Sequence, residues 1–484
     1  MKVFVYKNVD TEIHATRLTA SRRRLCAVWR RRNRLRLAVK QIMPLLTLLI
    51  SLASLKTAHA QSEAHAIQFE LLKLENSQAI PQSFGDVPNK LDVSYRVLDK
   101  EGKPVETEVS FVDRPYRYSI SNLSHRWASA PGQDSIAEIA LIPKKGFQVT
   151  LRRLRVATFS GSHDLKIRLL EEGGKVLEDR AIKIEERSPF TLAPASTSTK
   201  GFRFQWETRN RNMGLAAISV LLTPIDQKPF EPIVNSLGLT FEKVPGSKSL
   251  VATTEVRVKD YAAFAKENPE IDNSWNTFIW EEWSKVFQTW RIPSKNPDRG
   301  DLNKGPLVED VYAKQTLDDP VVNVSWEDAN TFCRWLSKKE GRTYRLLTDH
   351  EWSCAAGIAS TEDSALSPGE KSGRVHHYVW GTHFPPKVNS ENLREFHQFK
   401  DDYPHTSPVT ATSANLFGLY GLAGNVQELC EDPLAEGSFF KVVRGGGWRT
   451  RELHATSSSR AGLPPFQRNI SIGFRIALES EIAQ

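Results

Sequence analysis

The chain has 484 residues, 40% of them hydrophobic, so it is long enough for two or three domains with complete hydrophobic cores. Its formal charge of +8 comes from one end, because residues 1–60 hold 13 Lys and Arg residues but only 2 Asp and Glu residues. The remainder carries a net charge of −3, which excludes a nucleic-acid-binding function argued from overall basicity.

Residues 1–60 have the pattern of a targeting segment. An arginine-rich stretch precedes a short apolar run at residues 42–55, too short to span a bilayer comfortably. Ala58-His59-Ala60 then matches the small-x-small pattern of a signal-peptidase site. We expect cleavage near Ala60 and export to the periplasm or cell exterior, without a transmembrane helix in the mature chain. A disordered basic arm or a membrane anchor is the alternative.

The mature chain would retain three cysteines, Cys333, Cys354 and Cys430. An odd number allows at most one internal disulfide and leaves one thiol free. Buried thiols that pack as small apolar side chains are the expected state.

Residues 61–224 have the pattern of an all-β domain, which we expect to be a jelly-roll-like sandwich. Period-2 alternation, which buries one face of a strand, recurs in six short runs. These runs lie at 93–97, 105–111, 147–151, 165–169, 202–206 and 218–222. Residues 159–222 are similar to galactose-binding-like jelly rolls, so carbohydrate binding through Arg203, Arg209 and Arg211 is one hypothesis. Solvated strand faces are the other.

A proline-rich stretch at residues 225–236 predicts a linker, and the next domain is expected over residues 237–480. Two stretches of this domain have the Ser/Thr and Asp/Glu spacing of a helix-capping box. The expected elements are a strand at Val251–Val258, a helix from Asp260 to Lys266, an aromatic helical face between Asn276 and Trp290, and capped helices after Ser325 and Thr348.

Several strings in the second half occur in a fixed order. They are PVVNVSWEDANTFCRWL at 320–336, YRLLTDHEWSCAAG at 344–357, VWG at 379–381, SPV at 407–409, NLFGLYGLAGNVQE at 415–428, RGGGW at 444–448 and IGFR at 472–475. Together they resemble the formylglycine-generating enzyme, or sulfatase-modifying factor, family. The resemblance implies an irregular α+β fold related to C-type lectins, so the whole chain is expected to be a multidomain protein.

Enzymes of this family oxidise a sulfatase cysteine to formylglycine, using oxygen and copper held by two cysteine thiolates. By the resemblance, these cysteines follow the Gly-Gly-x-Trp string by two and seven residues, which are Thr450 and Ala455 here. Neither side chain can bind Cu(I) as soft sulfur does or form a mixed disulfide. We therefore expect no catalytic residue and no copper; an oxidase acting on a sulfatase cysteine is the rival hypothesis.

The resemblance also implies two structural calcium sites, whose mixed oxygen ligands suit this ion. The first would use the Asn392 and Asp401 side chains with the Leu393 and Tyr403 carbonyls. Asp401 is preferred to Asp402 by its distance from the Ser-Pro-Val string. The second would use the Gly424 and Val426 carbonyls and the Glu428 side chain, but its fourth position, usually Asp or Asn, is Gly421 here. Loop hydrogen bonding by Asn425 and Glu428 is the alternative.

Other motif residues are expected to be structural. Gly445-Gly446-Gly447 lacks the Lys-Ser/Thr of a phosphate-binding loop and matches the family's close strand approach. Arg444 and Arg475 match buried ion-pair positions, and His376, His377 and His383 are expected in loops.

The sequence therefore favours an exported, non-catalytic binding protein. Its former substrate groove would bind a peptide, a glycan or a protein partner. The residues expected to line this groove are Trp448, Thr450, His454 and Arg460.

Overall fold

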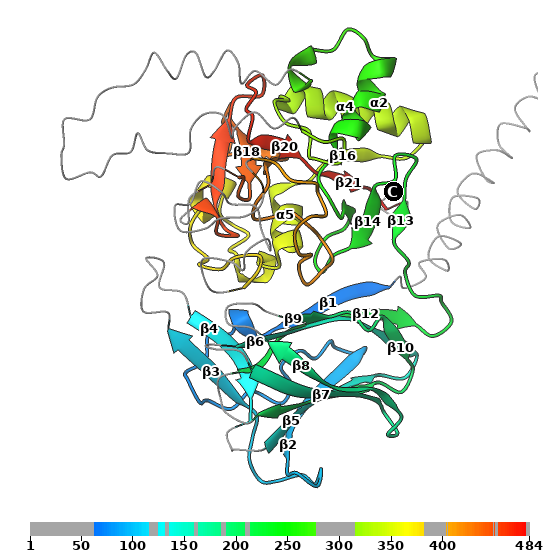
Figure 1. The fold of residues 1–484 in the computed structure, drawn as a ribbon, viewed down its shortest axis with the longest axis vertical. Coiled ribbons are helices and arrows are strands. Elements are labelled where there is room, and N and C mark those ends of the chain that lie inside the picture. The colour runs from blue at the N-terminus through cyan, green and yellow to red at the C-terminus, as the bar shows by residue number, and fades with distance from the viewer. Residues whose placement is uncertain are drawn as a thin grey trace, which may run out of the picture. The chain divides into compact units, whose positions relative to one another are not determined.

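The computed structural model describes residues 62–115, 124–130, 135–158, 163–184, 190–208, 213–276, 315–381, 403, 405–448, 450 and 454–480 (Figure 1). Residues from Ser62 onward form one compact unit. The predicted leader, the aromatic face between Asn276 and Trp290, Arg209, Arg211 and His383 lie outside the described ranges or almost entirely so. Within those ranges, no helix combines the length and apolarity needed to cross a bilayer.

The N-terminal region consists of two antiparallel sheets. The first contains β1 (Glu63–Gln68), β3 (Ser110–Pro115), β4 (Ser124–Ser129), β6 (Phe147–Thr158), β9 (Phe190–Leu192), β10 (Ser196–Ser198) and β12 (Met213–Pro224). The second has the order β2 (Leu91–Leu98), β5 (Ser135–Pro143), β11 (Phe202–Thr208), β7 (His163–Glu171) and β8 (Val176–Ile184). A single 3-10 turn, η1 (Phe69–Leu71), follows β1.

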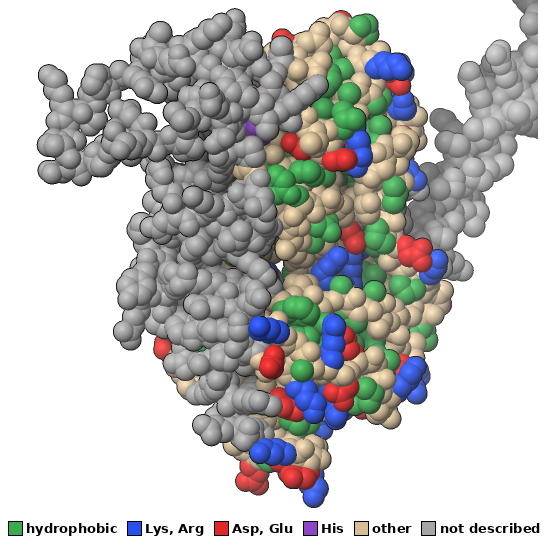
Figure 2. Space-filling model, in the orientation of Figure 1, with side chains coloured by type: hydrophobic (Ala, Val, Ile, Leu, Met, Phe, Trp, Pro, Cys, Tyr) green, Lys and Arg blue, Asp and Glu red, His purple; other side chains and the backbone are tan. Residues whose placement is uncertain are grey.

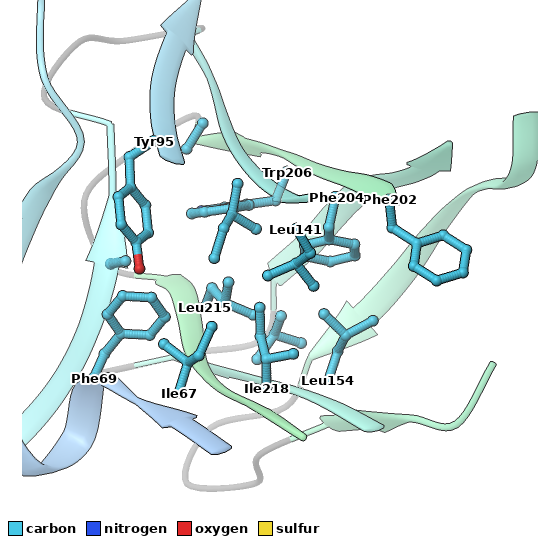
Figure 3. Packing of buried hydrophobic residues seen from close by; sticks show 14 of the residues in the cluster. Ile67, Phe69, Tyr95, Leu141, Leu154, Phe202, Phe204, Trp206, Leu215 and Ile218 are labelled. Carbon is cyan, nitrogen blue, oxygen red and sulfur yellow. The ribbon is translucent and has the colours of Figure 1, made fainter. Parts of the chain in front are cut away.

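Buried side chains from both sheets form one hydrophobic cluster (Figure 3). Leu154 and Ile218 from the first sheet point toward Leu141, Phe204 and Trp206 from the second (Figure 3). This follows from the pleat, because every second side chain of a strand lies on the same face. The strands predicted from alternating runs are confirmed as β2, β6, β7, β11 and β12, because each places alternate side chains in this cluster.

The predicted strand at residues 105–111 is largely wrong, because β3 begins only at Ser110. Val105 is 39% exposed, and the pairing next to it consists of an isolated bridge between Leu98 and Pro104 and a hydrogen bond from the Val105 amide to the Val97 carbonyl at 3.0 Å. Proline has no amide hydrogen to donate to a ladder, which limits pairing at this point.

The C-terminal region contains two smaller sheets. One has the order β13 (Ile233–Val234), β14 (Thr240–Lys243), β15 (Leu250–Ala252), β21 (Ile476–Leu478) and β16 (Tyr344–Leu346). The other has the order β19 (Arg460–Leu463), β18 (Lys441–Arg444), β17 (Gln427–Pro433) and β20 (Ile472–Phe474). Because β15 pairs with β21, the beginning and the end of this region lie in one sheet.

The helices accompanying these sheets are α2 (Val258–Glu267), α4 (Trp326–Glu340), α5 (Asp349–Ala356) and α6 (Pro368–Lys371), with 3-10 turns η2 (Asn273–Trp275) and η4 (Ala359–Thr361). The helix expected near Asp260 is confirmed as α2. The strand expected at Val251–Val258 is wrong beyond Ala252, since β15 ends there and α2 begins at Val258.

Both predicted capping boxes are confirmed. Ser325 Oγ accepts a hydrogen bond from the Asp328 amide at 3.1 Å, and Asp328 Oδ2 accepts one from the Ser325 amide at 2.8 Å. Thr348 and Glu351 make the same reciprocal pair at the start of α5. These bonds satisfy amides that the first turn of a helix leaves without partners. The predicted boundaries 61–224, 225–236 and 237–480 stay predictions.

Candidate functional site

The loop between β18 and β19 carries the two positions where the family resemblance places cysteines. It begins at Gly445, whose φ of +74° lies in the left-handed region that glycine tolerates. A Cβ atom there would lie 2.5 Å from the Leu422 carbonyl oxygen and 3.0 Å from the Trp352 ring. The glycine run thus permits close packing, as predicted.

Thr450 closes a turn that begins at Gly447 within this loop. Its hydroxyl accepts a hydrogen bond from the Gly447 amide at 2.7 Å, and its own amide donates to the Gly447 carbonyl at 2.8 Å. Ala455 is buried in a hydrophobic cluster with Tyr378 and Trp380. One position therefore holds a hydrogen-bonded hydroxyl and the other a packed methyl group, so these residues do not fit a Cu(I) ion, which needs soft sulfur ligands.

The described thiols do not replace that pair. Cys333, Cys354 and Cys430 are all free and buried, which confirms the expectation of buried thiols. Burial raises the pKa of each thiol, for Cys354 to about 12. Each of the three is therefore a neutral thiol near neutral pH.

The four residues expected to line a groove differ in their surroundings. His454 is exposed and Thr450 is partly exposed. Trp448 is buried, its amide donates to the Asn425 carbonyl at 2.8 Å, and its ring lies edge-on to His405 with centroids 6.1 Å apart. Arg460 is buried and faces the interior. The structure therefore leaves Thr450 and His454 as the accessible members of the set.

Arg460 belongs to a buried cluster of charges under the loop. Its guanidinium donates to both Asp349 carboxylate oxygens, at 2.9 and 3.0 Å, and to both Glu362 carboxylate oxygens, at 2.8 and 2.9 Å. Arg444 also pairs with Asp349 and lies 4.3 Å above the Trp352 ring centroid. Burial alone would raise the pKa of Asp349, but the two arginines hold it below its ordinary value.

A second buried ion pair joins β17 to the C-terminal strand region. Arg475 Nη2 donates to Glu428 Oε1 at 2.7 Å, while Trp352 Nε1 donates to Glu428 Oε2 at 2.9 Å. The predictions that Arg444 and Arg475 are buried ion-pair partners are thus confirmed. Both carboxylate oxygens of Glu428 are already engaged with protein donors.

Glu255 lies beside this pair and is completely buried. Burial raises its pKa to about 8, with Arg475 Nη2 3.9 Å from Glu255 Oε2 as a partial counterweight. The Glu255 carboxylate also fills the space where a side chain at Gly421 would begin. Gly421 is therefore explained by packing as well as by its φ of +69°.

The calcium predictions stay predictions. Asn392, Leu393 and Asp401 lie outside the described residues, and Tyr403 is partly buried. Gly424 and Val426 are buried in the loop that leads into β17. In the described part of the chain, no group of three or more His, Cys, Asp and Glu residues is arranged to hold a metal ion. Backbone carbonyls would supply half of the first predicted ligand set, and the Gly424 and Val426 carbonyls would supply most of the second.

Sequence reasoning missed a buried contact around His377. His377 Nε2 lies 3.1 Å from Glu70 Oε2, and Arg155 Nη2 pairs with the same oxygen at 2.7 Å. The His377 carbonyl accepts a hydrogen bond from the Ser457 amide at 2.7 Å, two residues beyond Ala455. The run of arginines in β6 was the available signal, since a charged strand face needs partners when it is buried.

The C-terminal region resembles known proteins. Residues 243–480 match the model of the sulfatase-modifying factor enzyme 1-like domain. Over 210 residues the chain is 31% identical to "Inactive C-alpha-formylglycine-generating enzyme 2" of Mus musculus, covering 41% of this chain and 56% of that protein. Over 186 residues it is 30% identical to "Formylglycine-generating enzyme" of Streptomyces coelicolor, covering 34% of this chain and 54% of that protein.

Among solved structures, PvdO from Pseudomonas aeruginosa matches at 18% identity with a TM-score of 0.35, covering 52% of this chain and 100% of that one. The chain spans about half the length of the curated relatives it matches. The motif order, the buried arginine pairs and the family match agree: residues 243–480 form a domain of the formylglycine-generating enzyme, or sulfatase-modifying factor, family.

Proposed function

We propose that this protein is an exported, non-catalytic member of the family that binds a peptide, glycan or protein partner at the β18–β19 loop. The observation that carries the proposal is the state of the two copper positions. The Thr450 hydroxyl accepts a hydrogen bond from the Gly447 amide, and the Ala455 methyl group packs into a hydrophobic cluster. The 31% identity to "Inactive C-alpha-formylglycine-generating enzyme 2" of Mus musculus supports this proposal.

The surface offered by the loop suits binding rather than redox chemistry. His454 and Thr450 are accessible, and the loop is held from below by the buried Asp349–Arg444–Arg460 cluster. In the N-terminal region, the shared cluster of the two sheets supports a jelly-roll-like sandwich as the finer description of that fold.

Arg203, one of the residues considered for carbohydrate binding, pairs with Glu138 at 2.7 Å and with Glu172 at 2.6 Å. Its guanidinium is thus already engaged within the second sheet. These ion pairs do not favour a glycan as the partner of Arg203, so we propose the β18–β19 loop as the binding site.

The proposal is tested by following a Cys-x-Pro-x-Arg sulfatase peptide by mass spectrometry after incubation with the full chain, oxygen and Cu(I). The expected result is an unchanged peptide, with an active formylglycine-generating enzyme as the positive control. Conversion of the cysteine to the aldehyde by the full chain would overturn the proposal. A circular dichroism spectrum of the same sample establishes that the protein is folded.

A further inference from the structure

Three phenylalanines form an exposed aromatic patch on the C-terminal domain. Phe439, Phe440 and Phe466 are 58%, 46% and 60% exposed. The Phe439 ring lies 6.0 Å from that of Phe466 and 6.2 Å from that of Phe440, measured between centroids. Single exposed apolar side chains are ordinary, but three that are joined through contacts of the Phe439 ring mark an interaction surface.

The patch lies away from the β18–β19 loop. Phe439 and Phe440 belong to the connection between β17 and β18, and Phe466 follows the end of β19. Because β18 is antiparallel to both β17 and β19, the β17–β18 turn and the end of β19 meet at one end of the sheet. The β18–β19 loop, with Thr450 and Ala455, lies at the opposite end, so the patch is a separate surface.

The loops that carry the patch are held in place. The Leu434 amide donates to the Phe440 carbonyl at 2.8 Å, and the Gly369 amide donates to the Leu434 carbonyl at 2.8 Å. The Glu327 amide donates to the Pro465 carbonyl at 3.4 Å, which fixes the segment before Phe466 to the start of α4. A surface ordered before binding loses less entropy when a partner docks.

The ring geometry disfavours a sugar. The interplanar angles are 72° between Phe439 and Phe440 and 46° between Phe439 and Phe466, so the rings offer no flat platform. Phenylalanine also lacks the polar group that would bind a hydroxyl. An apolar side chain inserted among inclined rings fits this arrangement better.

The charges around the patch favour a basic partner. Two basic groups near the patch are engaged: Lys441 lies 4.0 Å above the Trp326 ring centroid and donates to the Glu431 carbonyl, and Arg468 pairs with Asp328 at 2.8 Å. Glu436, in the Phe439 loop, and Glu327, beside Pro465, are exposed acids. Such a rim attracts Lys or Arg and repels the anionic headgroups of a membrane.

We infer that the patch of Phe439, Phe440 and Phe466 docks a segment of a partner protein in which apolar side chains are flanked by Lys or Arg. This inference does not depend on the function proposed for the β18–β19 loop. The apolar side chains would insert among the rings, where burial drives association, and the basic groups would face Glu327 and Glu436.

The probe is a fluorescein-labelled Lys-Leu-Lys-Phe-Lys-Leu peptide, titrated with the full chain and followed by fluorescence polarisation. Two matched peptides replace every Lys by Glu, or every Leu and Phe by Ser. The doubly substituted variant Phe439→Ser/Phe466→Ser is compared with Val176→Ser/Val234→Ser, which removes two other exposed apolar side chains. All four substitutions are on the surface, and circular dichroism establishes folding.

The expected result is saturable binding of the first peptide, weakened at least tenfold by Phe439→Ser/Phe466→Ser and unchanged by Val176→Ser/Val234→Ser. Both control peptides should bind at least tenfold more weakly, and salt should reduce binding. Absence of binding, equal binding by the phenylalanine variant, or equal binding of the Glu peptide would overturn the inference. So would phenylalanine-dependent binding to phosphatidylcholine vesicles or phenylalanine-dependent self-association in sedimentation experiments.

Discussion

The buried ion pairs of the C-terminal domain can be compared with the β18–β19 loop, which begins directly after Arg444. Arg444, at the end of β18, and Arg475, after β20, are each buried in complete ion pairs with Asp349 and Glu428. In the loop that follows Arg444, Thr450 and Ala455 occupy the two positions where the family resemblance places copper-binding cysteines. The buried ion pairs are therefore present while neither of these two positions holds a sulfur atom.

The largest expected effect comes from breaking the framework at Arg475. Arg475→Met should lower the free energy of unfolding by about 3–5 kcal/mol, because it leaves Glu428 buried without its cation. Chemical denaturation followed by tryptophan fluorescence measures this change. Arg468→Met, which removes a partly exposed cation, should cost about 1 kcal/mol or less. Equal costs for the two variants would show that the buried pair is not what holds β17 and the C-terminal strands together.

A second effect depends on pH through Glu255. Burial raises the pKa of Glu255 in the folded state to about 8, above its ordinary value of 4.5. Between these two pH values, the carboxyl group is protonated in the folded state and ionised in the unfolded state. The resulting stabilisation is therefore present below about pH 4.5 and is lost as pH rises toward 8. Glu255→Gln, which cannot ionise, should match the natural chain at pH 5 and exceed it by about 1 kcal/mol or more at pH 9.

Thermal unfolding of the two proteins between pH 5 and pH 9 measures the difference. Glu231→Gln removes a carboxylate that is 70% exposed and serves as the control with a flat difference profile. A Glu255→Gln profile that is equally flat would contradict a raised pKa at this position.

Calcium removal tests the loops that the fold resemblance assigns to metal binding. Chelation with EDTA should lower the melting temperature by about 2–4 °C relative to millimolar calcium, because an ion that binds only the folded state stabilises it. Magnesium at the same concentration is the control. Identical melting temperatures in calcium and EDTA would remove the calcium prediction for both ligand sets.

The smallest effect concerns the turn at Thr450. Thr450→Val should destabilise the protein by about 1 kcal/mol, since the Gly447 amide loses its acceptor. Thr450→Ser retains the hydroxyl and should be close to neutral. If Val and Ser are tolerated equally in thermal unfolding, the hydroxyl is not a structural replacement for the family cysteine.

Local patterns predicted local structure well. The capping boxes at Ser325 and Thr348 are visible in sequence because their partners lie three residues apart. The strands β2, β6, β7, β11 and β12 were readable because each buries alternate side chains. The motif order pointed to the domain family and to the buried state of Arg444 and Arg475.

Contacts between distant parts of the chain were not predictable in this way. His377 meets Glu70 across 307 positions, and no periodicity links them. Arg460 was expected at a groove, but Asp349 and Glu362, about 100 residues earlier, bind it in the interior. The aromatic patch is not predictable from local sequence, because the pairing of β17, β18 and β19 brings Phe439 and Phe466 together.

The chain keeps the buried ion pairs of the fold, and we expect it not to bind Cu(I) at Thr450 and Ala455. This expectation is tested most directly by a Cu(I) competition titration of the folded full chain against a colorimetric chelator. Thr450→Cys/Ala455→Cys provides the matched comparison, since it supplies two sulfur ligands at the family positions. The predicted result is no stoichiometric Cu(I) uptake by the natural chain and one equivalent by the double variant. One equivalent bound tightly by the natural chain would contradict the absence of a copper site.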